Sequence, residues 1–140
     1  MRVFLVFPFL LLLSACFASE PQVVLKGRRF DVEVATTPKM QALGLMFRDS
    51  MADDHGMLFI FPGAATRSFW MKNTRIPLDI FYFDENLRLV NVAQDVKPCH
   101  IPRCPVYSSE GPARYVLELN AGKAAELAVK PGDALVLDLD

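Results

Sequence analysis

Apolar and polar residues alternate in short segments along most of this chain, and turn-forming residues separate the segments. Residues 29–35 show the pattern most clearly, because Phe and Val alternate there with Arg, Asp and Glu, as in a strand with one buried face. The period then changes, and Thr37 followed by Pro38 is typical of the start of a helix, which we expect to run to about Met46. Further strands are predicted at 22–26, 57–61, 78–83, 88–96, 114–119 and 134–139, and a second short helix at 121–129.

Seven or eight short strands with two short helices favour a mainly β fold, a small antiparallel β-sandwich or barrel-like domain. The segment 78–83 is apolar except for Asp79, so we expect this strand to be covered on both faces. The chain has 140 residues and shows no repeat and no internal domain boundary. Residues 22–140 are long enough to form a single domain with its own core.

The first 15 residues have the pattern of a bacterial lipoprotein signal peptide. A positive residue precedes an apolar run at 3–13, which is too short to span a bilayer as a helix. The sequence Leu-Ser-Ala-Cys that follows resembles a lipobox, so we expect cleavage before Cys16 and lipidation of its thiol. Residues 16–21 would then form a short tether to the membrane. The alternative is an ordinary secretory signal that is cut after Ala18.

Both kinds of signal predict an exported protein. A lipidated Cys16 predicts a protein anchored in the cell envelope, with the membrane as its partner. Phe17 rather than an aspartate follows this cysteine, which resembles the default signal for the outer membrane, facing the periplasm, in a cell with two membranes. The formal net charge is −1, which gives no reason to expect nucleic acid as a partner, because nucleic-acid-binding proteins normally carry a basic patch.

Two cysteines, Cys99 and Cys104, remain in the mature domain. In an oxidising compartment such a pair at short spacing indicates a structural disulfide. The redox-active motif of oxidoreductases has two residues between its cysteines, whereas this pair has four. A zinc site needs about four ligands, and only His100 lies nearby. The sequence therefore favours a disulfide over a redox or metal site, and we expect no metal and no cofactor.

The most unusual segment is 69–79, which contains the only tryptophan and places polar side chains among large apolar residues. Unpaired polar groups are costly in such surroundings. Glu118 lies in a second apolar segment, where a carboxylate either faces solvent or is paired. We expect Lys72 to pair with Asp79 or Glu118, and Arg48 to pair with the other. The candidate ligand-binding residues are Arg48, Trp70, Lys72, Asn73, Thr74, Asp79 and Glu118.

Three interpretations of these residues remain open. They form a structural network of ion pairs, or they bind a small polar ligand or a partner protein in a pocket lined by Phe59, Phe69 and Trp70, or they support general acid–base catalysis by Asp79 or Glu118. No serine or cysteine stands in a recognisable nucleophile setting. The sequence therefore favours a function other than catalysis.

The methionines suggest one further class of function. Five of them lie within 32 positions, and thioethers bind copper(I). Copper binding requires several sulfur atoms to converge on one exposed point, whereas methionines inside apolar segments more often fill gaps in a core. We therefore expect core filling. The five are Met40, Met46, Met51, Met57 and Met71.

Several blocks of sequence, in a fixed order, are similar to those of a known family. They are Gly44–Arg48, Gly56–Phe59, Phe69–Thr74, Ile76–Asp79, Tyr115–Glu118, Ala121–Gly122 and Gly132–Asp133. Together they resemble the domain of unknown function 192 over roughly residues 22–139. The resemblance implies a mainly β, jelly-roll-like domain that is often exported. It implies no established activity and no catalytic residues.

Overall fold

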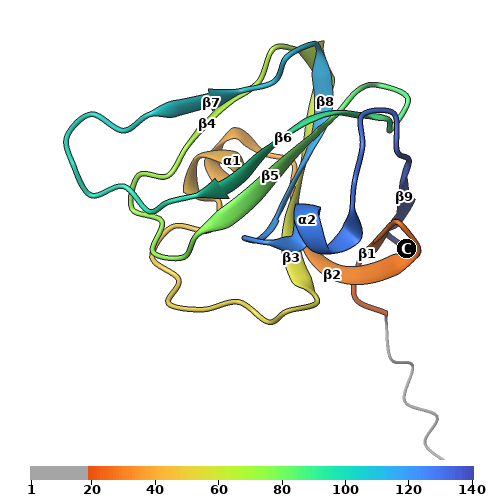
Figure 1. The fold of residues 1–140 in the computed structure, drawn as a ribbon, viewed down its shortest axis with the longest axis horizontal. Helices are drawn as coiled ribbons and strands as arrows, with labels where there is room; N and C mark the ends of the chain where they lie inside the picture. Colours follow the sequence, from red (N-terminus) through yellow and green to blue (C-terminus); the bar gives the residue numbers. More distant parts are fainter. Residues whose placement is uncertain (1–18) are drawn as a thin grey trace, which may run out of the picture.

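The computed structural model describes residues 19–140, which form one curled sheet of seven strands, a separate two-stranded sheet and two short helices (Figure 1). The large sheet has the strand order β6-β5-β8-β3-β2-β1-β9, and β4 pairs with β7. Within the described residues, no helix has the length and apolar character needed to cross a membrane. The strands are β1 (Gln22–Leu25), β2 (Arg28–Ala35), β3 (His55–Ala65), β4 (Ser68–Trp70), β5 (Leu78–Phe83), β6 (Leu89–Val96), β7 (Val106–Ser108), β8 (Ala113–Asn120) and β9 (Leu135–Asp138), and the helices are α1 (Pro38–Leu43) and α2 (Lys123–Leu127).

The mainly β fold with two short helices is confirmed. One pair departs from the expected antiparallel arrangement, because β2 and β3 run parallel. Parallel neighbours need a crossover connection, and the segment that contains α1 provides it. The side chain of Thr37 accepts a hydrogen bond from the backbone N–H of Met40 and so caps this helix, as its sequence predicts.

The centre of the sheet is buried on both faces. All six residues of β5 are buried, and their side chains alternate between two apolar clusters. Ile80 and Tyr82 belong to the first cluster, whereas Phe81 and Phe83 belong to the second. The expectation that this strand is covered on both sides is therefore confirmed.

Four elements differ clearly from the sequence prediction. The helix α1 ends at Leu43 rather than near Met46, because Gly44 caps it there. The predicted strand at 57–61 extends to His55–Ala65, and its pairing with β8 is irregular after Ile60. That irregularity accommodates Pro62, which has no N–H to donate. The strand β7 lies in a segment predicted as loop, since only its pairing with the distant β4 makes it a strand. The helix α2 begins at Lys123, two residues later than predicted.

The predicted disulfide is confirmed. Cys99 and Cys104 are bonded, with their Cα atoms 5.8 Å apart. The backbone N–H of Cys99 donates to the carbonyl of Met71 at 3.2 Å. The closed loop is therefore fastened to the chain just after β4, and it leads directly into β7.

Gly56 is required by the close approach of β3 to β8. A Cβ atom on this residue would lie 2.5 Å from the carbonyl oxygen of Glu118 and 2.6 Å from a methyl carbon of Leu119. We expect Gly56→Ala to lower the free energy of unfolding by about 2 kcal/mol in urea titrations, because a backbone atom has to move. Gly63→Ala is the matched control in the same strand, since a Cβ there meets nothing within 4 Å. Equal stability of the two variants would contradict this account of Gly56.

Candidate functional site

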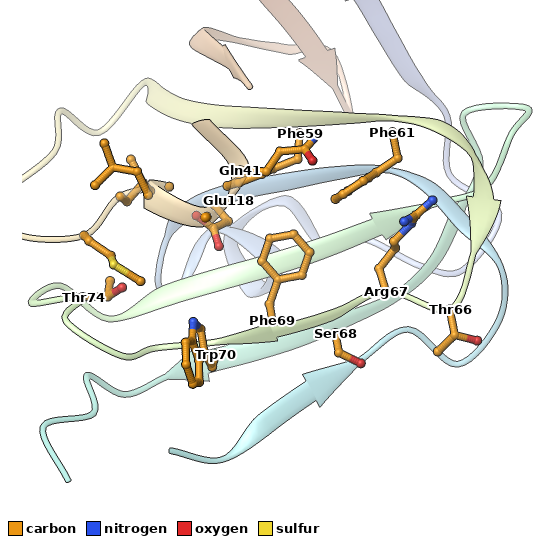
Figure 2. Close-up of a pocket in the computed structure, with 15 residues that line it drawn as sticks. Gln41, Phe59, Phe61, Thr66, Arg67, Ser68, Phe69, Trp70, Thr74 and Glu118 are labelled. Carbon is orange, nitrogen blue, oxygen red and sulfur yellow. The ribbon is translucent and has the colours of Figure 1, made fainter. Parts of the chain in front are cut away.

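A pocket of about 350 Å³ opens on the face of the sheet that carries the first apolar cluster (Figure 2). One wall comes from α1 and the turn that follows it, and a second comes from β3. The segment 66–70, which includes β4, forms the third wall. The pocket thus lies where the crossover helix and the small two-stranded sheet meet the large sheet.

Glu118 lies inside this pocket, and its side chain points into it (Figure 2). It is held in the centre of the sheet, opposite Met57 of β3 and Ile80 of β5. Only 5% of the residue is exposed, and its carboxyl group forms no hydrogen bond or ion pair with any residue in the described range 19–140. Burial raises the pKa of Glu118 to about 8, because no partner offsets the loss of water around the charged form.

Aromatic rings form much of the pocket wall. Phe69 lies edge-to-face against Phe59, with ring centroids 5.0 Å apart, and it makes similar contacts with Phe61 and Tyr82. These contacts fix the ring of Phe69 beside Glu118 (Figure 2). Trp70 also lines the pocket, yet 48% of it is exposed. The wall is therefore rigid near the carboxyl group and open at Trp70.

Two polar side chains fasten the walls to the large sheet. The amide of Gln41 in α1 donates to the carbonyls of Ala35 and Ile60 at 3.2 and 3.0 Å, which holds the helix over β2 and β3. Arg67 donates to the carbonyls of Ala113 and Gly63. Burial lowers the pKa of Arg67, and its guanidinium group has no carboxylate partner within residues 19–140.

Three of the seven predicted ligand-binding residues line the pocket, namely Trp70, Thr74 and Glu118. Phe59 and Phe69, the expected wall residues, line it as well. Sequence reasoning missed the contribution of the first helix, of Phe61 and of the loop before β4. Nothing local in the sequence marks these residues, since the crossover brings α1 to the pocket, and the pairing of β3 with β8 brings Phe61 and the segment that follows β3. The missed side chains with a polar or aromatic group are Gln41, Phe61, Thr66, Arg67 and Ser68.

Lys72 and Asn73 do not line the pocket. The ammonium group of Lys72 lies 5.2 Å from the centroid of the Trp70 ring, so the predicted pairing of Lys72 with Asp79 or Glu118 is wrong. Asn73 has a φ of 56°, and its carbonyl accepts a hydrogen bond from the backbone N–H of Phe47 at 2.8 Å. Asn73 therefore forms a turn that joins the segment after β4 to the turn that follows α1.

Asp79 serves the opposite face of the sheet. It lies opposite Leu119, one position from the Ile80–Glu118 pair, and side chains alternate along a strand. Its fully buried carboxylate accepts hydrogen bonds from the backbone N–H groups of Asp95, Gly122 and Ala124, at 2.7, 3.1 and 2.8 Å. Asp79 thus caps α2 and fixes the end of β6.

Arg48 pairs with neither Asp79 nor Glu118, so that predicted pairing is wrong too. Both of its terminal nitrogens donate to the carboxylate of Glu33 in β2, and the ring of His55 lies 3.1 Å from the same carboxylate. Hydrogen bonds from Arg48, and then from His55, hold the pKa of Glu33 below its usual range. This cluster fastens the crossover to the start of β3.

The buried carboxyl of Glu118 has a measurable consequence for stability. Its pKa is about 8 in the folded protein and close to the ordinary value of 4.5 in the unfolded chain. Between these values the folded state holds one more proton than the unfolded state, so stability falls as the pH rises, by about 1.4 kcal/mol per pH unit. We expect Glu118→Gln to flatten this dependence in urea titrations between about pH 5 and 8. The exposed Glu110→Gln is the control, and an equally steep dependence in Glu118→Gln would contradict the assignment.

The chain is similar to a known protein family and to solved structures over most of its length. The family model of DUF192, described as an uncharacterized ACR, matches residues 22–137. A protein of unknown function from Novosphingobium aromaticivorans DSM 12444 is 38% identical, with a TM-score of 0.75, over 83% of this chain and 82% of that one. A putative transcription regulator from Sinorhizobium meliloti 1021 is also 38% identical, with a TM-score of 0.75, over 84% of this chain and 91% of that one. No curated protein matches the chain. The chain belongs to the DUF192 family.

Proposed function

We propose that this domain binds a small ligand in the pocket beside α1, with Glu118 as the polar contact inside it. The observation that carries the proposal is a carboxyl group that is buried, lacks a partner within the described residues and faces a cavity of about 350 Å³. A concave site that combines aromatic side chains with polar groups directed into it is typical of small-molecule binding.

A purely structural role accounts poorly for Glu118. The ion pairs of this domain lie elsewhere, as with Arg48 and Glu33 or Lys123 and Asp53, and Asp79 is satisfied by three backbone N–H groups. Replacing a buried, unpaired carboxyl by an apolar side chain is usually neutral or stabilising. A ligand that pairs with Glu118 would offset its cost in the folded protein.

General acid–base catalysis by Glu118 is the second candidate function. Its pKa of about 8 suits proton transfer near neutral pH. However, the only other charged residue among those that line the pocket in the described structure is Arg67. A pocket with a single titrating carboxyl supplies no separate acid and base, so we favour binding.

The pocket edge also bears on the alternative of a partner protein. Leu43 and Trp70 line the pocket and are 54% and 48% exposed, so a side chain of a partner protein would reach Glu118 between them.

Copper binding has less support. Met57 and Met71 belong to the first apolar cluster and Met51 packs against it, so three of the five methionines fill the core as expected. The expectation is wrong for Met40, which is 45% exposed, and Met46 lines the pocket.

We further propose that the domain is exported and held in the cell envelope by a lipid on Cys16. The support is the sequence of residues 1–16, which lies outside the residues that the structure describes. The first described residues lead directly into β1. The tether would therefore attach at the β1 side of the sheet.

The ligand-binding proposal predicts that filling the pocket abolishes binding. Ala42 is exposed on α1 and lines the pocket, so Ala42→Trp should block it without disturbing the core. We expect ligand-observed NMR with benzylamine, benzyl alcohol, benzoate and glucose to show binding of at least one probe to the wild type and a loss of about tenfold or more in this variant. Ala125→Trp, at an exposed site on α2, is the matched control. If no probe binds, or if both variants bind equally, the pocket is not the site.

The anchoring proposal predicts that Cys16→Ala releases the protein from membranes. Without a thiol at this position the lipid cannot be attached, so we expect the protein to fractionate with soluble proteins. Cell fractionation and metabolic labelling with a fatty acid measure the two effects. Ser14→Ala, which leaves the cysteine in place, is the control. Unchanged membrane association of Cys16→Ala would contradict lipidation.

A further inference from the structure

We propose that the ligand carries an organic ammonium group, such as a primary or N-methylated amine, which lies against Glu118 inside the pocket. This inference rests on the proposed binding function, because it names the class of ligand for the same pocket. It follows from two independent features of that pocket, namely a carboxyl group that no basic side chain of residues 19–140 pairs with and the aromatic rings in its walls.

No basic side chain forms an ion pair with Glu118 within residues 19–140, although Arg67 lines the same pocket. The nearby basic side chains of the described structure are engaged elsewhere. Lys72 lies over the ring of Trp70, Arg48 is bound by both terminal nitrogens to Glu33, and Arg67 is fastened to two backbone carbonyls. A carboxylate removed from water is strongly stabilised by an opposite charge at close range. A cation brought by the ligand would supply it.

The walls beside Glu118 favour an organic cation. Phe59, Phe69 and Trp70 line the pocket, and the face of an aromatic ring attracts a cation, most strongly where water is excluded. Figure 2 shows the ring of Phe69 next to the carboxyl group of Glu118, and Trp70 is a half-exposed ring of the same lining. Aromatic rings together with a carboxylate suit an alkylammonium group.

A metal ion fits this pocket poorly. Metal sites need several ligands, and no group of three or more His, Cys, Asp or Glu side chains gathers anywhere in residues 19–140. Glu118 is the only carboxylate among the pocket residues. A single carboxylate between aromatic rings therefore suits an ammonium group better than a metal ion.

Binding of an ammonium ion should be coupled to the proton on Glu118. Burial raises the pKa of this carboxyl to about 8, so the free pocket is largely protonated at pH 7, and an ammonium ligand has to displace that proton. The neighbouring strand β5 contributes one titratable group, Tyr82, whose hydroxyl donates to the carbonyl of Tyr107. The strand β3 and helix α1 face Glu118 with Met57, Phe59 and Gln41, which do not titrate, and Arg67 stays charged.

The test compares benzylamine with benzyl alcohol, which has nearly the same shape and no charge. NMR titrations of the wild-type domain should give a dissociation constant about tenfold or more lower for the amine. Below the pKa of Glu118, the affinity for the amine should rise by close to tenfold per pH unit, because only the carboxylate form binds it. The affinity for the alcohol should not rise with pH.

Glu118→Gln keeps the shape of the side chain and removes its charge. We expect this variant to lose about tenfold or more of the affinity for benzylamine and the pH dependence with it, while benzyl alcohol still binds. Glu110→Gln is the matched control, because Glu110 is exposed and does not line the pocket. Backbone amide spectra of both variants establish that the fold is kept.

The outcomes separate the two proposals. Equal or tighter binding of benzyl alcohol, still blocked by Ala42→Trp, would overturn the ammonium inference and leave the binding pocket in place. Binding of benzylamine that is insensitive to Glu118→Gln would overturn the inference as well. Failure of every probe to bind in a pocket-dependent manner would overturn both proposals.

Discussion

The structure depends on the burial of β8 on all sides. This strand pairs with β3 along one edge and with β5 along the other, and its side chains alternate between two apolar clusters, with Val116 in the first and Leu117 and Leu119 in the second. The central residues of this strand, 116–119, are buried on both faces. A polar side chain placed there has to be satisfied by the protein or by something that enters a pocket beside it.

Two buried carboxyl groups meet this constraint in different ways. Asp79 is satisfied by backbone N–H groups that belong to β6 and α2, so its charge is used to join those elements. Glu118 faces the other side of the sheet and receives no such donors from the described residues. Its side chain opens instead into the pocket. The first carboxyl therefore stabilises the fold, whereas the second is free to pair with a ligand.

The sequence was sufficient for the elements whose signals are local. Alternation predicted β2, the Thr37–Pro38 pair predicted α1, and the spacing of Cys99 and Cys104 predicted their disulfide. The apolar context of Glu118 also singled it out correctly as a buried group. The partners of the charged residues were beyond local reasoning, because they depend on register. Glu118 is paired with Ile80 and not with Asp79, so the side chains of Asp79 and Glu118 point to opposite faces of the sheet. Arg48 meets Glu33 only because the crossover makes β2 and β3 parallel.

The same arrangement explains why the pocket has a fixed floor and attached walls. Glu118 is held by two strand pairings, so its carboxyl group cannot move out to water without disturbing the centre of the sheet. The walls are carried by a six-residue helix and by β4, which are fastened by Gln41, Arg67 and the disulfide-closed loop. A preorganised group costs little to order when a ligand binds. The cost of removing the neutral Glu118 carboxyl from water is met during folding, and a complementary cation has only to displace its proton on entering the pocket.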